Sequence, residues 1–147
     1  MTGPDARRAK GAGAPKPPKS VPVRATPPAD GPSTREVGAS GEDRAVRFLL
    51  GLGYRILMRN YRCRHGEIDV VAFEGGEYVF VEVKLRASDD KGSALDAVTR
   101  AKQKKLARVA QQYLAERRIE DRPCRFDVVA LGAGPGEDDV VRGAFHL

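Results

Sequence analysis

Residues 66–86 read GEIDVVAFEGGEYVFVEVKLR, and this stretch determines most of the predicted fold. Two runs rich in β-branched and aromatic residues flank Gly75 and Gly76, which can supply the two positive φ angles that a two-residue hairpin turn requires. If these glycines form the turn, Glu74 pairs with Glu77, and the residue numbers of every further cross-strand pair sum to 151. The stretch therefore predicts an antiparallel hairpin with a defined register.

This register predicts a polar patch on one face of the hairpin. It places Asp69 directly opposite Glu82 and Glu67 directly opposite Lys84. Because residues i and i+2 of a strand share a face, these four side chains would lie together. The other face is a predicted core surface formed by Ile68, Val70, Ala72, Val79, Val81 and Val83.

The two facing acids indicate a metal site. Like charges directly opposite each other destabilise a sheet, so a positive group is expected between Asp69 and Glu82. Mg²⁺ (or Mn²⁺) prefers oxygen ligands and keeps several waters, so these two carboxylates suffice, with the carbonyl oxygen of Val83 as a third ligand. Lys84 could then orient or deprotonate a water, or neutralise charge on a pentavalent phosphorus, and the site would hydrolyse a phosphodiester. The alternative is a surface hairpin with a Glu67–Lys84 pair and solvated acids.

Composition divides the chain of 147 residues into two parts. Residues 1–38 hold eight of the ten prolines and seven Lys/Arg against three Asp/Glu, which predicts a disordered basic arm, and residues 39–147 form one α/β domain. No apolar run approaches the roughly 20 residues that a membrane-spanning helix needs, and no apolar signal segment is found. Cys63 and Cys124 show no zinc-binding spacing. We therefore expect a reduced, cytoplasmic protein without a membrane partner.

Hydrophobic periodicity predicts the elements around the hairpin. Ser40 and Asp43 resemble a capping box for a first helix that ends near Gly51. A second helix is predicted over residues 93–118, with an apolar face of Leu95, Val98, Leu106, Val109 and Tyr113. Strands are predicted at Tyr54–Tyr61, Glu67–Phe73, Tyr78–Leu85, Phe126–Leu131 and, at an edge, Val140–Phe145. This order predicts a mixed β-sheet of four to five strands flanked by α-helices, with a parallel crossover through the long helix.

The acidic pattern resembles a known nuclease motif. Asp69, twelve intervening residues and Glu82-x-Lys84 are similar to the PD-(D/E)xK superfamily, with Ile68 in place of its proline. The chain more closely resembles the small bacterial YraN-like proteins, a family related to Holliday-junction resolvases and restriction endonucleases. The blocks that carry this resemblance are Gly41-Glu42, Arg59-Asn60, Gly66-Glu-Ile-Asp69, Phe80-Val-Glu-Val-Lys84, Lys102-Gln103 and Arg125-Phe-Asp127.

The resemblance implies a restriction-endonuclease-like fold over residues 39–131, DNA rather than RNA as the nucleic-acid partner, and a homodimer. It also implies that Asp69 and Glu82 bind the metal, that Lys84 is catalytic, and that Glu42 lies near the metal. For Glu42, a favourable interaction with the dipole of the first helix is an equal alternative. Glu67 is either a fourth carboxylate of the site or the partner that positions Lys84, and the second role is favoured.

Lys102 interrupts the apolar face of the long helix, one turn from both Val98 and Leu106. Its side chain either extends past the sheet edge to water or points into the acidic patch. The resemblance favours the patch, because nuclease relatives often complete the site with a Lys or Gln from this helix. Gln103 is the lesser candidate.

Two groups of basic residues are candidates for nucleic-acid binding, namely Arg59, Arg62 and Arg64 before the hairpin and Lys104 and Lys105 on the long helix. The alternative for both groups is a solvated charged surface. Asp127 alternates with apolar neighbours and is expected to be structural. The sequence thus predicts a nucleic-acid-binding, metal-dependent endonuclease. A non-catalytic nucleic-acid-binding module that retains the fold, or a protein-interaction domain, are the alternatives.

Overall fold

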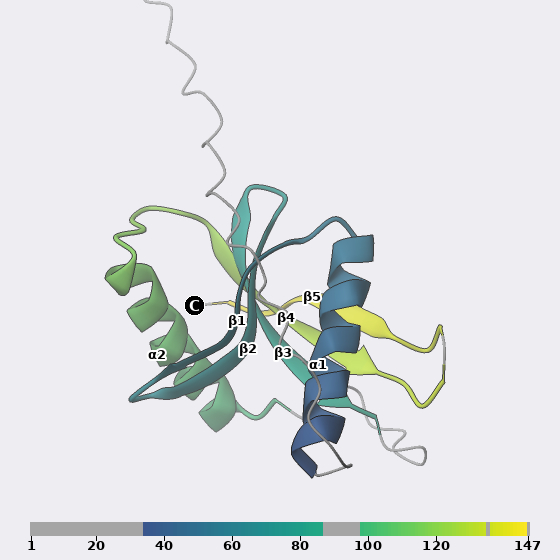
Figure 1. Ribbon diagram of the computed structural model, residues 1–147. Coiled ribbons are helices and arrows are strands. Elements are labelled where there is room, and N and C mark those ends of the chain that lie inside the picture. Colours follow the sequence, from purple (N-terminus) through teal and green to yellow (C-terminus); the bar gives the residue numbers. More distant parts are fainter. Residues whose placement is uncertain (1–33, 87–97, 135, 147) are drawn as a thin grey trace, which may run out of the picture.

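The structure is a computed structural model that describes residues 34–86, 98–134 and 136–146, with side chains from Gly41 onward. Its elements follow the predicted order of one helix, three strands, one helix and two strands (Figure 1). They are α1 (Thr34–Gly51), β1 (Arg55–Cys63), β2 (Gly66–Glu74), β3 (Glu77–Leu85), α2 (Arg100–Glu116), β4 (Cys124–Leu131) and β5 (Asp139–Phe145). Neither helix is long and apolar enough to cross a membrane within the described residues.

The five strands form one sheet in the order β1-β2-β3-β4-β5. Neighbouring strands are antiparallel except β3 and β4, which are parallel and are connected through α2. The predicted parallel crossover and the edge position of the last strand are therefore confirmed. The architecture is the expected mixed α/β arrangement, consistent with a restriction-endonuclease-like fold.

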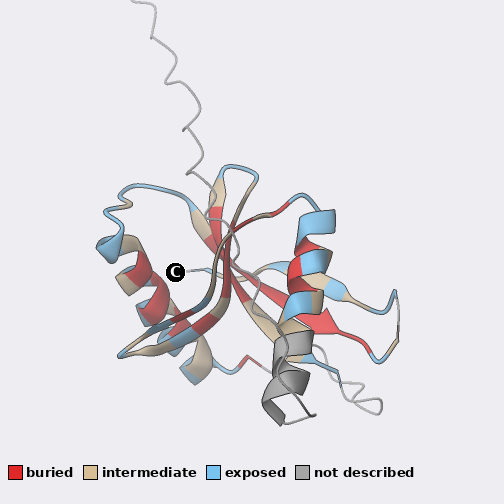
Figure 2. Ribbon diagram, in the orientation of Figure 1, coloured by how far each residue is buried: buried red, intermediate tan, exposed pale blue. Residues whose placement is uncertain are grey.

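The sheet is covered by one helix on each face (Figures 1 and 2). Ala45, Val46 and Leu49 of α1 lie in one buried cluster, with alternate residues of β2, β3 and β4. The apolar face of α2 lies in a second buried cluster on the other side of the sheet, through Leu106, Val109, Ala110 and Tyr113. Burial of both sheet faces explains why β3 and β4 are apolar along much of their length.

The first helix ends at Gly51 as predicted, but both helices begin at other residues than predicted. Because α1 begins at Thr34, Ser40 lies inside the helix, and the predicted capping box is wrong. The second helix is shorter than residues 93–118: Thr99 is its N-cap, with a side-chain oxygen that accepts the backbone N–H of Lys102 at 3.3 Å. Leu95 and residues 1–33, most of the predicted arm, lie outside the described residues.

The hairpin register is confirmed from Glu74–Glu77 to Val70–Val81. The predicted faces, however, are wrong beyond Val70, because Ile68 packs in the cluster with α2 while Val70 packs in the cluster with α1. The cause lies in the neighbouring strand β1. Asn60 has a left-handed backbone with φ of 53°, and the β1–β2 register places it opposite Asp69. A left-handed residue breaks the regular alternation of a strand, so both strands change faces at this level.

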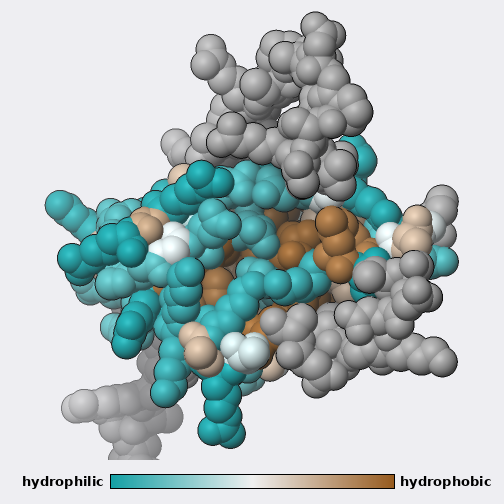
Figure 3. Space-filling view, turned by 90° about the horizontal axis from the view of Figure 1, so that it is seen from below, coloured by the Kyte–Doolittle hydropathy of each residue, from teal (hydrophilic) through white to brown (hydrophobic). Residues whose placement is uncertain are grey.

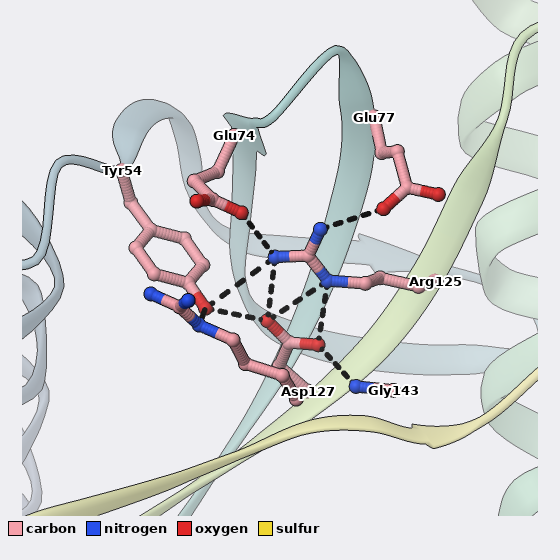
Figure 4. Close-up of polar contacts among 7 residues, drawn as sticks. Tyr54, Glu74, Glu77, Arg125, Asp127 and Gly143 are labelled. Carbon is pink, nitrogen blue, oxygen red and sulfur yellow. Dashed lines mark hydrogen bonds and ion pairs between the residues drawn. The ribbon is translucent and has the colours of Figure 1, made fainter.

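A buried polar network supports the turn end of the hairpin (Figure 4). The guanidinium of Arg125 in β4 donates to Glu74 and to Glu77, each at 2.6 Å, and also to Asp127, which is fully buried. Asp127 accepts a further hydrogen bond from the hydroxyl of Tyr54 at 2.8 Å. These contacts agree with the structural role expected for Asp127, since buried charges are retained only when they are paired.

Candidate functional site

Glu82 is the centre of a charged cluster near the C-terminal end of β3. Its Oε1 atom binds the ammonium of Lys84 at 3.1 Å and the ammonium of Lys102, which comes from α2. The Glu82 side chain is 11% exposed, and the two lysine side chains are about one-third exposed. The structure therefore brings together three of the predicted site residues.

The pKa of Lys102 reflects this environment. Partial burial lowers the pKa, but the hydrogen bond to Glu82 and the charges of Glu82 and Asp69 raise it, and the net direction is upward. Lys102 is thus a firmly protonated cation that faces the acidic residues of β2 and β3. Of the two orientations considered from the sequence, the structure has the one that points into the patch.

Asp69 fills the gap where the β2–β3 ladder ends. Its Oδ2 atom accepts the backbone N–H of Val83 at 2.8 Å, in place of a cross-strand backbone bond. The N–H and C=O of one strand residue point the same way, so the carbonyl of Val83 faces the side occupied by Asp69. The two oxygen sources predicted from adjacent strands therefore converge.

The surroundings of Asp69 disfavour its ionised form and raise its pKa to about 6. Burial is the largest cause of this rise, and the charges of Glu82, Glu42 and Glu67 add to it, whereas the hydrogen bond from the Val83 N–H lowers the pKa. Two lysines compensate Glu82, whereas Asp69 remains poorly compensated. A cation placed against Asp69 would reverse this penalty.

The donor set fits a magnesium-type ion. No group of three or more His, Cys, Asp or Glu side chains in the described ranges is arranged to hold a metal. A cation here would therefore be bound by the carboxylates of Asp69 and Glu82, the carbonyl of Val83 and water. Mg²⁺ binds in this way, through one or two carboxylates and several retained waters, whereas zinc prefers a closed set of nitrogen and sulfur ligands.

Glu42 reaches this region from α1. The side-chain amide of Asn60 donates a hydrogen bond to Glu42 Oε2 at 2.7 Å. The charge of Glu42 is among those that raise the pKa of Asp69. Asn60 was not singled out as a site residue from the sequence, although asparagine is one of the few residue types that readily adopts a left-handed backbone.

Glu67 does not position Lys84, and that prediction is wrong. Its carboxylate pairs with Arg62 at 3.1 Å, directly across the β1–β2 ladder, and both side chains are exposed. The change of faces at Asn60 and Asp69 separates Glu67 from its predicted partner. The lesser candidate Gln103 is also directed elsewhere, since its amide donates to the carbonyl of Val98 at 3.1 Å.

The five predicted nucleic-acid contacts fall into two groups. Arg59 and Arg62 form ion pairs with Asp43 and Glu67. None of the ion pairs found among the described residues includes the other three, Arg64, Lys104 and Lys105, and all three are exposed. The stem of Lys105 lies against Gly66, because a Cβ built on Gly66 would come within 2.6 Å of Lys105 Cε. Lys105 therefore links α2 to the β1–β2 turn.

The end of the molecule that carries these residues has a mixed surface. In Figure 1 the C-terminal end of β3 and the N-terminal end of α2 point downward, and Figure 3 views the molecule from below. Hydrophilic side chains surround an apolar area in that view. Leu85, the last residue of β3, is 60% exposed.

The family model and the similar proteins that match this chain carry the same family name. The model of the uncharacterised protein family UPF0102 matches residues 41–131. A UPF0102 protein of Symbiobacterium thermophilum is 49% identical over 116 residues, which cover 77% of this chain and 98% of that protein. A UPF0102 protein of Moorella thermoacetica is 45% identical over 115 residues, which cover 76% and 96%.

Among solved structures, the Pyrococcus furiosus SfsA structure in complex with Ca²⁺ is 14% identical, covers 80% of this chain and 73% of that chain, and has a TM-score of 0.30. Similarity this low supports no argument. The family match spans α1 from Gly41 onward, the whole β1–β3 region, α2 and β4, and thus all the residues described in this site. The chain belongs to the uncharacterised protein family UPF0102.

Proposed function

We propose that the protein is a nucleic-acid-binding, metal-dependent endonuclease that hydrolyses phosphodiester bonds with Mg²⁺ or Mn²⁺. The observation that carries this proposal is the poorly compensated Asp69 carboxylate beside Glu82, which itself binds two lysine ammonium groups. A metal ion bound here would lower the pKa of a coordinated water and polarise a phosphoryl oxygen.

The lysines have distinct roles in this proposal. Lys84 lies on β3 beside the acids, where its ammonium can donate to a non-bridging phosphate oxygen and neutralise the charge that develops on it. Lys102 holds the Glu82 carboxylate in place from α2 and adds a second positive charge at the same oxygen. The Val83 N–H fixes one oxygen of Asp69 and leaves the other free to turn toward a cation.

The exposed basic residues supply the binding surface in this proposal. Lys104 and Lys105 follow Lys102 on α2, and Lys105 connects this helix to the β1–β2 turn that carries Arg64. Phosphate contacts of this kind give affinity without sequence specificity and weaken with salt. We therefore assign Arg64, Lys104 and Lys105 to the nucleic-acid backbone, with DNA as the first substrate class to test.

The test is cleavage of duplex, single-stranded and four-way-junction DNA by the wild type and by Asp69→Asn and Lys84→Ala. Mg²⁺-dependent cleavage should be lost in both variants, while circular dichroism shows that both remain folded. Activity that persists equally in both variants would exclude this mechanism. The matched RNA substrates in the same assay decide between the two nucleic acids.

The ion pairs of Glu82 support one alternative function. Because two ammonium groups bind this carboxylate, the negative charge of Glu82 is already compensated without any metal. A non-catalytic nucleic-acid-binding module would keep this arrangement. That function predicts salt-dependent DNA binding that is unchanged by chelation of Mg²⁺ and by Asp69→Asn.

A further inference from the structure

Two consecutive residues of β1 bind two consecutive residues of α1. Arg59 pairs with Asp43, and the Asn60 amide donates to Glu42 at 2.7 Å. The two contacts join the same strand to the same helix, but they involve different chemistry. Only the second involves Asn60, which lies across from Asp69 in the β1–β2 register.

Asn60 has an unusual backbone conformation. Its φ of 53° lies in the left-handed region, which residues other than glycine, asparagine and aspartate rarely adopt. The β1–β2 register pairs Arg59 with Val70 and Tyr61 with Ile68, so Asn60 and Asp69 are the two opposed residues between these pairs. Asn60 is therefore a neighbour of Asp69 in the sheet.

The left-handed backbone explains how Asn60 can reach Glu42. Arg59 contacts Asp43 of α1, whereas Tyr61 packs in the cluster with α2, so the strand changes faces at Asn60. In a regular strand, residues 59 and 61 would share a face. The conformation at residue 60 thus sets the direction of the amide and, through it, the position of the Glu42 carboxylate.

We propose that Asn60 is a positioning residue of the metal site, which holds Glu42 so that this carboxylate accepts hydrogen bonds from water around a cation bound at Asp69 and Glu82. This inference rests on the proposed function and assigns a residue that the motif does not include. An outer role for Glu42 agrees with the geometry, since the described acids do not form a three-ligand group. Mg²⁺ and Mn²⁺ sites retain waters that need such acceptors. Loss of an outer-shell partner typically costs about 10–100-fold in metal affinity.

The experiment is calorimetric titration of Mn²⁺ into the full chain and its variants. Asn60→Gly retains the positive φ but removes the amide, so it should weaken Mn²⁺ binding about tenfold. Asp43→Ala is the matched control, because it breaks the adjacent α1–β1 contact and removes a carboxylate next to Glu42 in the chain. The control should bind Mn²⁺ within about twofold of the wild type. Urea denaturation checks that both variants remain folded.

A double-mutant cycle tests whether Asn60 acts through Glu42. Glu42→Ala should weaken Mn²⁺ binding at least as much as Asn60→Gly, and the double variant should bind no more weakly than Glu42→Ala alone. Additive losses, or an Asn60→Gly protein that binds Mn²⁺ like the wild type, would overturn the inference. Absence of Mn²⁺ binding by the wild type would overturn the proposed function together with this inference. Equal Mn²⁺ binding by the wild type and Asn60→Gly would overturn this inference alone.

Discussion

Lys102 of α2 and Lys84 of β3 bind the same carboxylate oxygen of Glu82. The two lysines reach this oxygen from different elements, and the contact from α2 fixes the helix against the end of β3.

Replacing Lys102 by methionine should lower the free energy of unfolding by about 1–2 kcal/mol at pH 7. The variant leaves a largely buried Glu82 carboxylate with one ammonium partner in place of two. Lys104→Met removes an exposed lysine of the same helix and should change stability by less than about 0.5 kcal/mol. Urea denaturation of the three proteins measures the difference, and equal losses in the two variants would contradict a stabilising Lys102–Glu82 pair.

Asp69→Asn should stabilise the metal-free protein at pH 7.5. The folded protein raises the pKa of Asp69 from 3.8 to about 6, so the folded state binds its proton more tightly than the unfolded state does. Ionisation of Asp69 therefore lowers the free energy of unfolding progressively as the pH rises from 3.8 to about 6, and the whole loss of stability is present above pH 6. Asparagine keeps an oxygen that can accept the Val83 N–H.

The expected gain for Asp69→Asn is about 1–3 kcal/mol in the presence of a chelator at pH 7.5, and it should disappear below pH 4. Urea denaturation across this pH range measures it. Addition of Mn²⁺ should narrow the gap by stabilising the wild type alone. A variant less stable than the wild type at pH 7.5 would show that the Asp69 carboxylate is compensated.

Lys84→Ala should reduce the rate of DNA cleavage about 10²–10⁴-fold while leaving Mn²⁺ affinity within a few-fold of the wild type. The proposed role of Lys84 concerns the phosphate and not the cation, so binding and rate should separate. Single-turnover cleavage and Mn²⁺ calorimetry give the two quantities. Parallel losses in both would instead indicate that Lys84 is needed to organise the acids.

Replacing Lys104 and Lys105 together by glutamine should weaken binding to duplex DNA and reduce the salt dependence of the association constant. Each lost phosphate contact lowers the slope of log K against log salt concentration by about 0.9. Arg122→Gln is the control, because Arg122 is exposed and precedes Pro123, which bonds to Tyr78 near the hairpin turn. Fluorescence anisotropy at several salt concentrations makes the comparison. If the slope of log K against log salt concentration is the same for the wild type and both variants, α2 does not contact the DNA.

Arg125→Leu should lower the free energy of unfolding by about 3–5 kcal/mol. The substitution leaves the fully buried Asp127 carboxylate without its cation, and it also removes the partner of Glu74 and Glu77. Arg125→Leu with Asp127→Asn should recover part of this loss, since no buried charge then remains. Thermal or urea unfolding of the single and double variants measures the free energies of unfolding. If the double variant is no more stable than Arg125→Leu, the loss of stability comes from altered packing and not from the unpaired Asp127 charge.

The sequence correctly predicted the features that depend on residues close together in the chain. Gly75 and Gly76 set the turn, and the pairing from Glu74–Glu77 to Val70–Val81 followed from it. The hairpin register needed only the period of a strand. The position of Lys102 within an apolar helical stripe left two directions open for its side chain, and the family resemblance favoured the acidic patch, where its ammonium contacts Glu82.

The errors occurred where a neighbouring strand alters the local pattern. The left-handed backbone of Asn60 in β1 changes the face of Ile68 in β2, and no periodicity within the hairpin itself reveals this. Glu67 was assigned to Lys84 because its other neighbour, Arg62, becomes visible only once β1 is paired. The start of α1 was placed at Ser40 because a serine followed by an acid is a common helix start, whereas the helix begins six residues earlier, at Thr34.

The hairpin turn depends on a residue far away in the chain. Glu74 and Glu77 face each other across Gly75 and Gly76, and both accept a hydrogen bond from the guanidinium of Arg125, at separations of 51 and 48 residues. A hairpin that forms before β4 docks would carry an uncompensated like-charge pair at its tip. The ion pairs at the turn therefore form only when β4 docks, and they belong to the non-local contacts that slow folding.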